Sequence, residues 1–173
     1  NGSPAGDSVP ALIAAGCIAL IAGPNGKREI PIEEFHIGPG KTVLDNGEML
    51  VSLKFPKREI NSSDAYLRMT PRTEMDIAVV GCAVNITFED NVCTAARVSL
   101  GAVAPTPLLI KEASKIMVGS DLNFEILDKV SKICMDLCDP IDDKRGTIDY
   151  RTKVAGVLFK RATLTTIDRI KGN

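Results

Sequence analysis

Hydrophobic and polar positions follow two different periods along this chain, and each period predicts a different kind of element. Apolar residues spaced three and four apart indicate helices, whereas alternation of apolar and polar residues indicates strands. The Asn25-Gly26 pair, between two such runs, is typical of a β-hairpin turn. The first part of the chain therefore predicts, in order, a helix over 8–16 ended by Gly16, strands over 17–22 and 27–32, a helical turn over 33–35, a glycine-rich loop over 38–40 and a strand over 48–55.

The polar, turn-rich segment 57–64 predicts a boundary between two domains, residues 1–58 and residues 65–173. After this boundary, the pattern predicts a small antiparallel sheet backed by helices, which is an α+β arrangement. The predicted elements are strands over 65–69, 83–89 and 92–103, a helix from Thr73 or Asp76 through Val80, and three helices over roughly 110–118, 123–138 and 148–169.

Composition and charge exclude several classes of function. With 45% hydrophobic and 25% charged residues, the chain is typical of a globular protein. Aromatic residues make up 4% of it, and its net charge is −1, which argues against nucleic-acid binding. No apolar run has the length of a membrane span. The five cysteines are odd in number and scattered, which indicates reduced thiols and a cytoplasmic location.

The first eight residues, Asn1 to Ser8, predict a tight polar loop that leads into the first helix. A loop that delivers small residues to a helix N-terminus can hold a phosphate or a ribose. Taken without further context, the loop favours a plainer interpretation, in which Asp7 caps the helix.

Other candidate sites favour structural roles. The segment Gly38 to Thr42 lacks the longer spacing of a phosphate-binding P-loop. His36 is the single histidine and lies between apolar neighbours, so we predict no catalytic residue there. Cys134 and Cys138 share a helix face, but a closed metal site needs more ligands, and we predict core packing and no metal site.

Five segments, in a fixed order and spacing, carry a resemblance to a known family. They are Asn1–Ser8, Phe35–Thr42, Gly47–Leu50, Arg72 with Met75–Ala78, and Leu100–Pro107. Over essentially its whole length the chain resembles the FAD-binding (medium) subunit of the molybdenum hydroxylases, the family of carbon monoxide and xanthine dehydrogenases.

The resemblance implies a more specific α+β fold. Residues 1–58 would be the end of an FAD-binding α+β domain of the PCMH/VAO type. Residues 65–173 would be the C-terminal domain of the subunit, a three-stranded antiparallel sheet with a helical bundle, in which Tyr150-Arg151 anchors the last helix. Glycine-rich loops that hold the FAD pyrophosphate would precede residue 1, so we expect the chain to be the C-terminal part of a longer subunit.

The resemblance also implies cofactor-binding residues, which are Asn1, Ser3, Gly6, Asp7, Leu50 and Arg68. Asp7 would form hydrogen bonds with the adenosine ribose, in a loop that Asn1, Ser3 and Gly6 also line. Leu50 would pack against the flavin, although a strand-core leucine is an alternative. Arg68 would place a positive charge near the isoalloxazine ring, where relatives carry lysine; the alternative is a surface arginine.

The function implied is that of an electron-transfer subunit in a molybdenum-flavin oxidoreductase, not active alone. Electrons would pass from [2Fe-2S] clusters on a small subunit, through FAD, to an external acceptor such as NAD or a quinone. A large subunit would bind molybdopterin, and the assembly would be a dimer of heterotrimers. The alternative is a domain that mainly docks subunits, without direct flavin chemistry. A free-standing FAD oxidase of the vanillyl-alcohol type is disfavoured, because the chain has two Tyr and one His.

Overall fold

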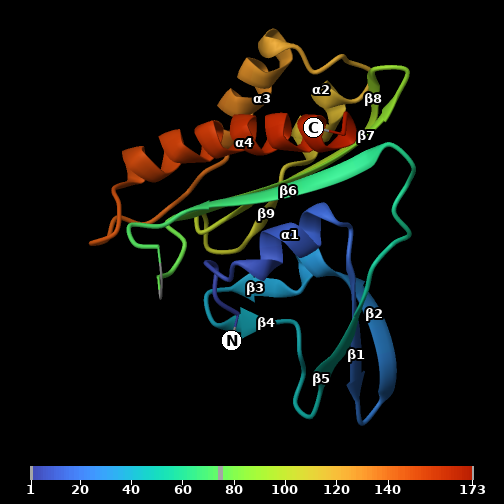
Figure 1. The fold of residues 1–173 in the computed structure, drawn as a ribbon. Coiled ribbons are helices and arrows are strands. Elements are labelled where there is room, and N and C mark those ends of the chain that lie inside the picture. The colour runs from blue at the N-terminus through green and yellow to red at the C-terminus, as the bar shows by residue number, and fades with distance from the viewer. Residues whose placement is uncertain (1, 74–75, 173) are drawn as a thin grey trace.

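The computed structural model describes residues 2–73 and 76–172, which form two parts that follow each other along the chain (Figure 1). The elements of the first part are α1 (Ser8–Ala14), β1 (Ile18–Gly23), β2 (Gly26–Pro31), the 3-10 turn η1 (Ile32–Glu34), β3 (His36–Gly38), β4 (Lys41–Thr42) and β5 (Met49–Lys54). Strands β2, β1 and β5 form one antiparallel sheet in that order, and β3 pairs with β4. The predicted Asn-Gly hairpin is confirmed, because β1 and β2 pair up to Gly23 and Gly26.

The elements of the second part are β6 (Ser62–Met69), β7 (Val80–Glu89), β8 (Val92–Gly101), β9 (Leu108–Leu109), α2 (Lys111–Met117), α3 (Phe124–Asp136) and α4 (Ile148–Ile170). The strands form an antiparallel sheet in the order β6-β7-β8-β9. Helices α2, α3 and α4 cover one face of this sheet, and α1 from the first part lies against the other (Figure 1). The second sheet is therefore enclosed by helices on both sides.

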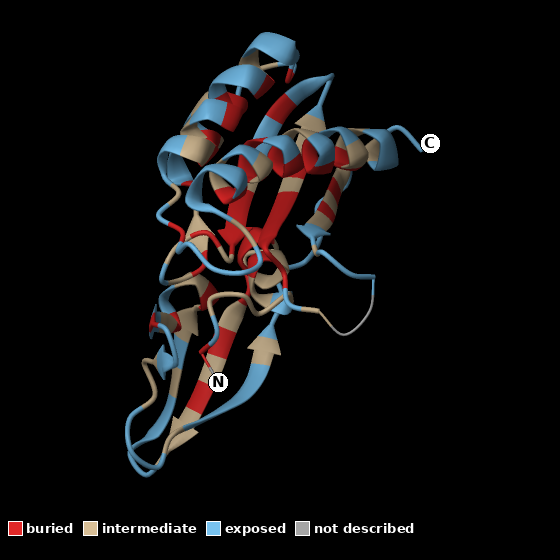
Figure 2. Cartoon of the chain, turned by 90° about the vertical axis from the view of Figure 1, so that its left-hand side faces the viewer, coloured by how far each residue is buried: buried red, intermediate tan, exposed pale blue. Residues whose placement is uncertain are grey.

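Each part has its own apolar core. The larger core joins β7 and β8 to the inward faces of α2, α3 and α4, with Phe159 as its largest fully buried side chain. The smaller core joins α1 to β1, and its members include Ile13 and Ile21. Figure 2 shows that burial follows these inward faces. In the first sheet β1 carries the buried side chains, β5 is largely exposed, and β2 is exposed or half-buried.

Local sequence explains where the two long helices begin and how closely they pack. The side chain of Asn123 accepts a hydrogen bond from Ile126 N at 3.1 Å, and Thr147 caps α4 in the same way. A Cβ at Gly156 would lie 2.6 Å from Ser131 Oγ, so glycine is needed where α4 crosses α3. None of the helices in the described part of the chain combines the length and hydropathy needed to cross a membrane.

The predicted α+β fold class is confirmed, but one predicted element is wrong. Asp76, Ile77 and Ala78 form no helix, and Val80 begins β7 instead. The Asp76 carboxylate accepts hydrogen bonds from Arg72 N and Ile77 N, and such local bonds compete with helix formation. Residues 74–75, also within this prediction, lie outside the described residues.

The boundaries and number of strands in the second sheet also differ from the prediction. Strand β6 begins at Ser62, three residues before the predicted start at Ala65, and β7 begins three residues before Ala83. In the described part of the chain, the two-residue strand β9 adds a fourth member to the expected three-stranded sheet. A strand this short has no period to detect, so the pattern could not predict it.

An ion pair joins β2 to the loop before β5 and gives a pH-dependent prediction. The Arg28 guanidinium donates to both Glu48 carboxylate oxygens, at 2.9 and 2.7 Å. This pair, with a hydrogen bond from Asp45 N, lowers the pKa of Glu48 from 4.5 to about 2. A depressed folded-state pKa contributes stability that is present above pH 4.5 and lost as the pH falls toward 2. We expect Glu48→Gln to remove this part of the acid sensitivity.

The measurement is the thermal unfolding midpoint of the complete subunit between pH 6 and the lowest pH at which it remains folded, on the order of pH 3. The difference between wild type and Glu48→Gln should shrink as the pH falls. Glu89→Gln is the matched control, since Glu89 is an exposed carboxylate at the end of β7. If the Glu48→Gln and wild-type midpoints fall in parallel, the account of this ion pair is wrong.

Candidate functional site

The N-terminal loop folds into a tight turn before α1. Gly6 N donates to Ser3 O at 3.2 Å, and Val9 N donates to Gly6 O at 3.1 Å. Ser3 Oγ accepts from Ala5 N at 3.3 Å. The backbone of Gly6 has a negative φ, and a Cβ there would meet only ordinary contacts, the nearest being Ser3 O at 3.4 Å. These short-range bonds fix the path of the loop from Ser3 to Asp7.

Two glycine-containing segments from elsewhere in the chain hold this loop in place. Gly40 N, in the turn between β3 and β4, donates to Gly2 O at 2.9 Å. Ala102 N, after β8, donates to Pro4 O at the same distance. A Cβ at Gly2 would lie 2.9 Å from Lys41 N, and Gly2 has a φ of +62°, so this position requires glycine. The turn at residues 38–40 is thus structural, as predicted.

Asp7 does not cap α1, so the capping interpretation is wrong. Its backbone has helical angles, φ −56° and ψ −37°, and its side chain makes no capping hydrogen bond. The carboxylate points instead to β6, where Tyr66 Oη donates to Oδ1 at 3.2 Å and the Arg68 guanidinium donates to Oδ2. Residues about 60 positions apart therefore form one polar cluster, Asp7, Tyr66 and Arg68.

This cluster is accessible to a ligand and carries one negative and one positive charge. The side chain of Asp7 is 41% exposed and that of Arg68 is 36% exposed. Burial raises the pKa of Tyr66, and the neighbouring Asp7 charge raises it further, so the phenol stays protonated and donates. A carboxylate offers about four lone-pair sites, and two are used within the cluster. The remaining acceptor capacity suits a pair of hydroxyl groups, such as the diol of a ribose.

Of the other predicted cofactor residues, Ser3 and Gly6 lie in the loop that carries Asp7, Leu50 lies apart from the cluster, and Asn1 is outside the described residues. Leu50 belongs to β5 in the first sheet, where it pairs with Ile21, and it is 37% exposed. The structure therefore brings Asp7 and Arg68 into contact, and it places Leu50 on a different sheet.

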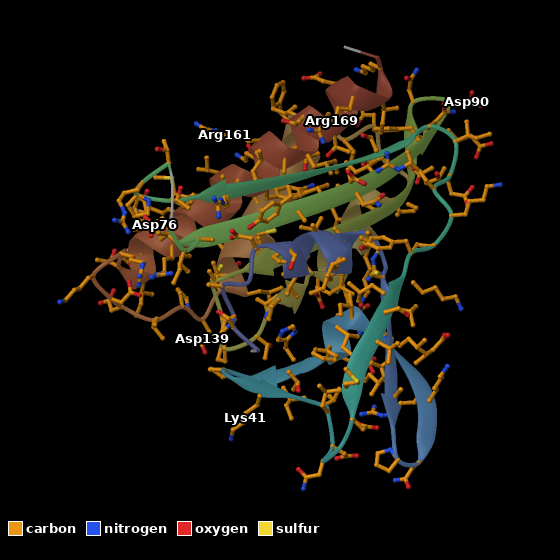
Figure 3. The ribbon with its side chains drawn as sticks, turned by 60° about the horizontal axis from the view of Figure 1, so that its bottom comes forward. Lys41, Asp76, Asp90, Asp139, Arg161 and Arg169 are labelled. Atoms are coloured by element: carbon orange, nitrogen blue, oxygen red, sulfur yellow. The ribbon has the colours of Figure 1, made fainter. Side chains whose placement is uncertain are left out.

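A mostly apolar cavity of about 370 Å³ lies beside the N-terminal loop. One wall is made by Ser3, Pro4 and Ala5, and another by Ile77 and Ala78 before β7. The loop between α3 and α4 closes it with Asp139, Pro140, Ile141, Asp143 and Arg145, and Arg151 at the start of α4 completes the lining. In Figure 3, Asp76 and Asp139 mark this end of the molecule, and Asp90, in the β7–β8 turn, marks the opposite end of the sheet.

Arg151 is the main buried charge at this cavity. Its guanidinium donates to Val79 O at 2.7 Å, Gly146 O at 3.3 Å and Ala102 O at 3.4 Å, and it pairs with Asp143 at 2.7 Å. It therefore ties the start of α4 to both neighbouring strand ends of the second sheet, which confirms the anchoring role predicted for Arg151. Tyr150, the other residue of the predicted anchor, is exposed. Because Ala102 also donates to Pro4, the same network reaches the N-terminal loop.

Cys134, Cys138 and the single histidine pack against neighbouring side chains. Cys134 and Cys138 are free thiols against the larger core, and burial raises the pKa of each. Within residues 2–73 and 76–172, no group of three or more His, Cys, Asp or Glu side chains could hold a metal ion. His36 packs edge-on against Phe35 with ring centroids 5.4 Å apart, and burial lowers its pKa.

Sequence reasoning missed Tyr66 and the supporting pair Gly101 and Ala102. Alternation along β6 puts Tyr66 on the same face as Arg68, so the period of the strand could have indicated it. A Cβ at Gly101 would lie 2.6 Å from Pro10 Cγ, and Ala102 has a φ of +63°. These long-range requirements leave no periodic signal in the sequence.

The fold and this site together define a two-part α+β chain with a polar cluster where the N-terminal loop meets the second sheet. Residues 65–166 match the family described as the CO dehydrogenase flavoprotein C-terminal domain. Residues 1–58 match the family described as the FAD binding domain in molybdopterin dehydrogenase. Since the first match covers more than half of the chain, the chain belongs to the CO dehydrogenase flavoprotein family, and the resemblance to medium subunits of molybdenum hydroxylases is confirmed.

Individual relatives agree with this family. The chain is 34% identical over 163 residues to the carbon monoxide dehydrogenase medium chain of Afipia carboxidovorans, covering 94% of this chain and 56% of that protein. It is 29% identical over 164 residues to the xanthine dehydrogenase FAD-binding subunit of Escherichia coli O157:H7, covering 93% of this chain and 56% of that protein. The structure of reconstituted CO dehydrogenase from Oligotropha carboxidovorans matches with a TM-score of 0.94 and 31% identity, over 98% of this chain and 59% of that one. The chain thus spans just over half the length of these relatives.

Proposed function

We propose that this chain is part of an FAD-binding electron-transfer subunit of a molybdenum-containing hydroxylase or dehydrogenase of the carbon monoxide, xanthine or aldehyde dehydrogenase type, not active alone. The observation that carries the proposal is the Asp7 carboxylate, held between Tyr66 and Arg68 at the end of a fixed loop and still partly exposed. Membership of the flavoprotein family supports it.

In this proposal each residue has a separate part in holding the cofactor. Asp7 accepts hydrogen bonds from the adenosine ribose, and Leu50 packs against the flavin. The resemblance implies a place for Arg68 near the isoalloxazine ring; because Arg68 pairs with Asp7, its positive charge in this proposal lies beside the ribose instead. Asn1, Ser3 and Gly6 line the loop. When bound, FAD supplies the redox chemistry, and the protein supplies binding, orientation and electrostatics.

The partners proposed are those that the resemblance to the family implies. They are a molybdopterin-binding large subunit, a small subunit with [2Fe-2S] clusters and the upstream segment that completes the FAD-binding domain. The proposed assembly is a dimer of heterotrimers in the cytoplasm. The subunit would carry electrons from the clusters, by way of FAD, to an external acceptor.

A second candidate, a domain that mainly docks subunits, is favoured by exposed apolar side chains on α4. Tyr150, Val157 and Leu164 are spaced seven apart, and all three are exposed. This spacing places them along one side of the helix, a pattern found where a helix meets a partner.

The experiment is to purify the complete native assembly, release its cofactors, and identify them by absorption spectrum and mass, with metal analysis of the same sample. We expect FAD together with molybdenum and iron. Molybdenum and iron without FAD would instead support the docking candidate. The absence of all three would contradict both.

A further inference from the structure

The two faces of β6 have different surroundings. Ala65 and Leu67 belong to the core covered by α4. Successive side chains of a strand point to opposite faces, so Tyr66 and Arg68 share the face turned toward α1. Both reach Asp7, at the start of that helix. The strand thus presents two donors, two residues apart, to one carboxylate.

Each Asp7 oxygen has its own donor within the cluster. Tyr66 Oη donates to Oδ1 at 3.2 Å, and the Arg68 guanidinium donates to Oδ2. Arg68 has a long, flexible side chain, and its partly exposed ion pair would not by itself stop the Asp7 carboxylate from rotating. The second donor, on the other oxygen, restricts that rotation.

The phenol ring that carries this second donor is closely confined. A Cβ at Gly81, on the neighbouring strand β7, would lie 2.9 Å from Tyr66 Oη and 3.2 Å from Tyr66 Cε2. The absence of a side chain at Gly81 therefore makes room for the ring. A tyrosine side chain has two rotatable bonds before its ring, so a confined ring holds its hydroxyl at a defined point, whereas a partly exposed arginine does not.

We propose that Tyr66 is a positioning residue that sets the orientation of the Asp7 carboxylate for the ribose of the cofactor. This inference rests on the proposed function, in which Asp7 binds FAD. With one lone pair of each oxygen occupied by Tyr66 or Arg68, the lone pairs that remain are held in a fixed direction for two adjacent hydroxyls.

The test compares Tyr66→Phe with wild type in the complete assembly, after removal of FAD and titration with added FAD. Tyr66→Phe keeps the ring beside Gly81 and removes one hydrogen bond to a carboxylate, so we expect the dissociation constant of FAD to rise about three- to tenfold. Thr94→Val is the control, since Thr94 on β8 is exposed and its hydroxyl also donates one hydrogen bond, to Thr87 O, near the other end of the sheet. Both variants should unfold at the wild-type temperature.

The same titration with Asp7→Ala and with the double variant separates the possible explanations. If Tyr66 acts through Asp7, the double variant should bind FAD no more weakly than Asp7→Ala alone. Two outcomes would overturn the positioning role but leave the role of Asp7 intact. One is a double variant that binds FAD more weakly than Asp7→Ala by the same factor that Tyr66→Phe shows alone. The other is a Tyr66→Phe variant with wild-type affinity for FAD while Asp7→Ala binds it more weakly. Normal affinity in both single variants would overturn the proposed function of Asp7 as well.

Discussion

Asp7→Ala is expected to weaken FAD binding by the complete subunit by about 10- to 100-fold, which corresponds to the loss of one or two hydrogen bonds to a charged acceptor. The expected loss is large because Asp7 is partly exposed, fixed by two donors and carried by a loop that Gly40 and Ala102 hold in place. Titration of the FAD-depleted assembly, followed by flavin fluorescence, measures it.

Asp64→Ala is the matched control for this experiment. Asp64 lies on the same strand, β6, and also pairs with an arginine, Arg58, but near the other end of the strand. The control should bind FAD as wild type does. If Asp7→Ala also retains full affinity, the docking candidate becomes the better account of this chain.

Arg151→Met is expected to destabilise the subunit by about 3 kcal/mol, because it removes a buried guanidinium that donates to three carbonyls and pairs with the half-buried Asp143 carboxylate. Arg151 is 4% exposed. Its removal leaves the Asp143 carboxylate and the carbonyls of Val79, Gly146 and Ala102 without this donor. The thermal unfolding midpoint should fall by roughly 10 °C.

Two further variants locate the cause of this loss. Arg151→Lys keeps the charge but not the planar fork of donors, so its midpoint should lie between those of wild type and Arg151→Met. Arg145→Met, at an exposed arginine in the loop before α4, should cost little. A midpoint for Arg151→Met within about 2 °C of wild type would contradict the anchoring role.

The sequence predicted elements well wherever short-range rules determine them. Period-two alternation indicated β7 and β8 with the turn between them, and the Asn-Gly pair indicated the β1–β2 hairpin. Caps at Asn123 and Thr147 agree with the predicted starts of α3 and α4. Asp76 shows the limit of these rules, because its local hydrogen bonds outweighed the helical pattern around it.

The candidate site was less predictable because its contacts are long-range. Asp7 and Arg68 were both expected to bind the cofactor, by resemblance, but at different parts of it. Their direct contact, across 61 positions, depends on how α1 packs against the second sheet. The close approach of Gly101 to Pro10 helps to fix that packing, and no local pattern indicates it.

The most direct test of the account is an experimental structure of the complete subunit with FAD bound, in which the distances from the Asp7 carboxylate oxygens to the ribose hydroxyl oxygens are measured. We predict at least one hydrogen bond, with an oxygen–oxygen distance of about 2.5–3.0 Å, while Tyr66 and Arg68 still contact the carboxylate. The account would be contradicted if the ribose lay beyond hydrogen-bonding distance of Asp7 and the Asp7 carboxylate contacted Tyr66 and Arg68 alone.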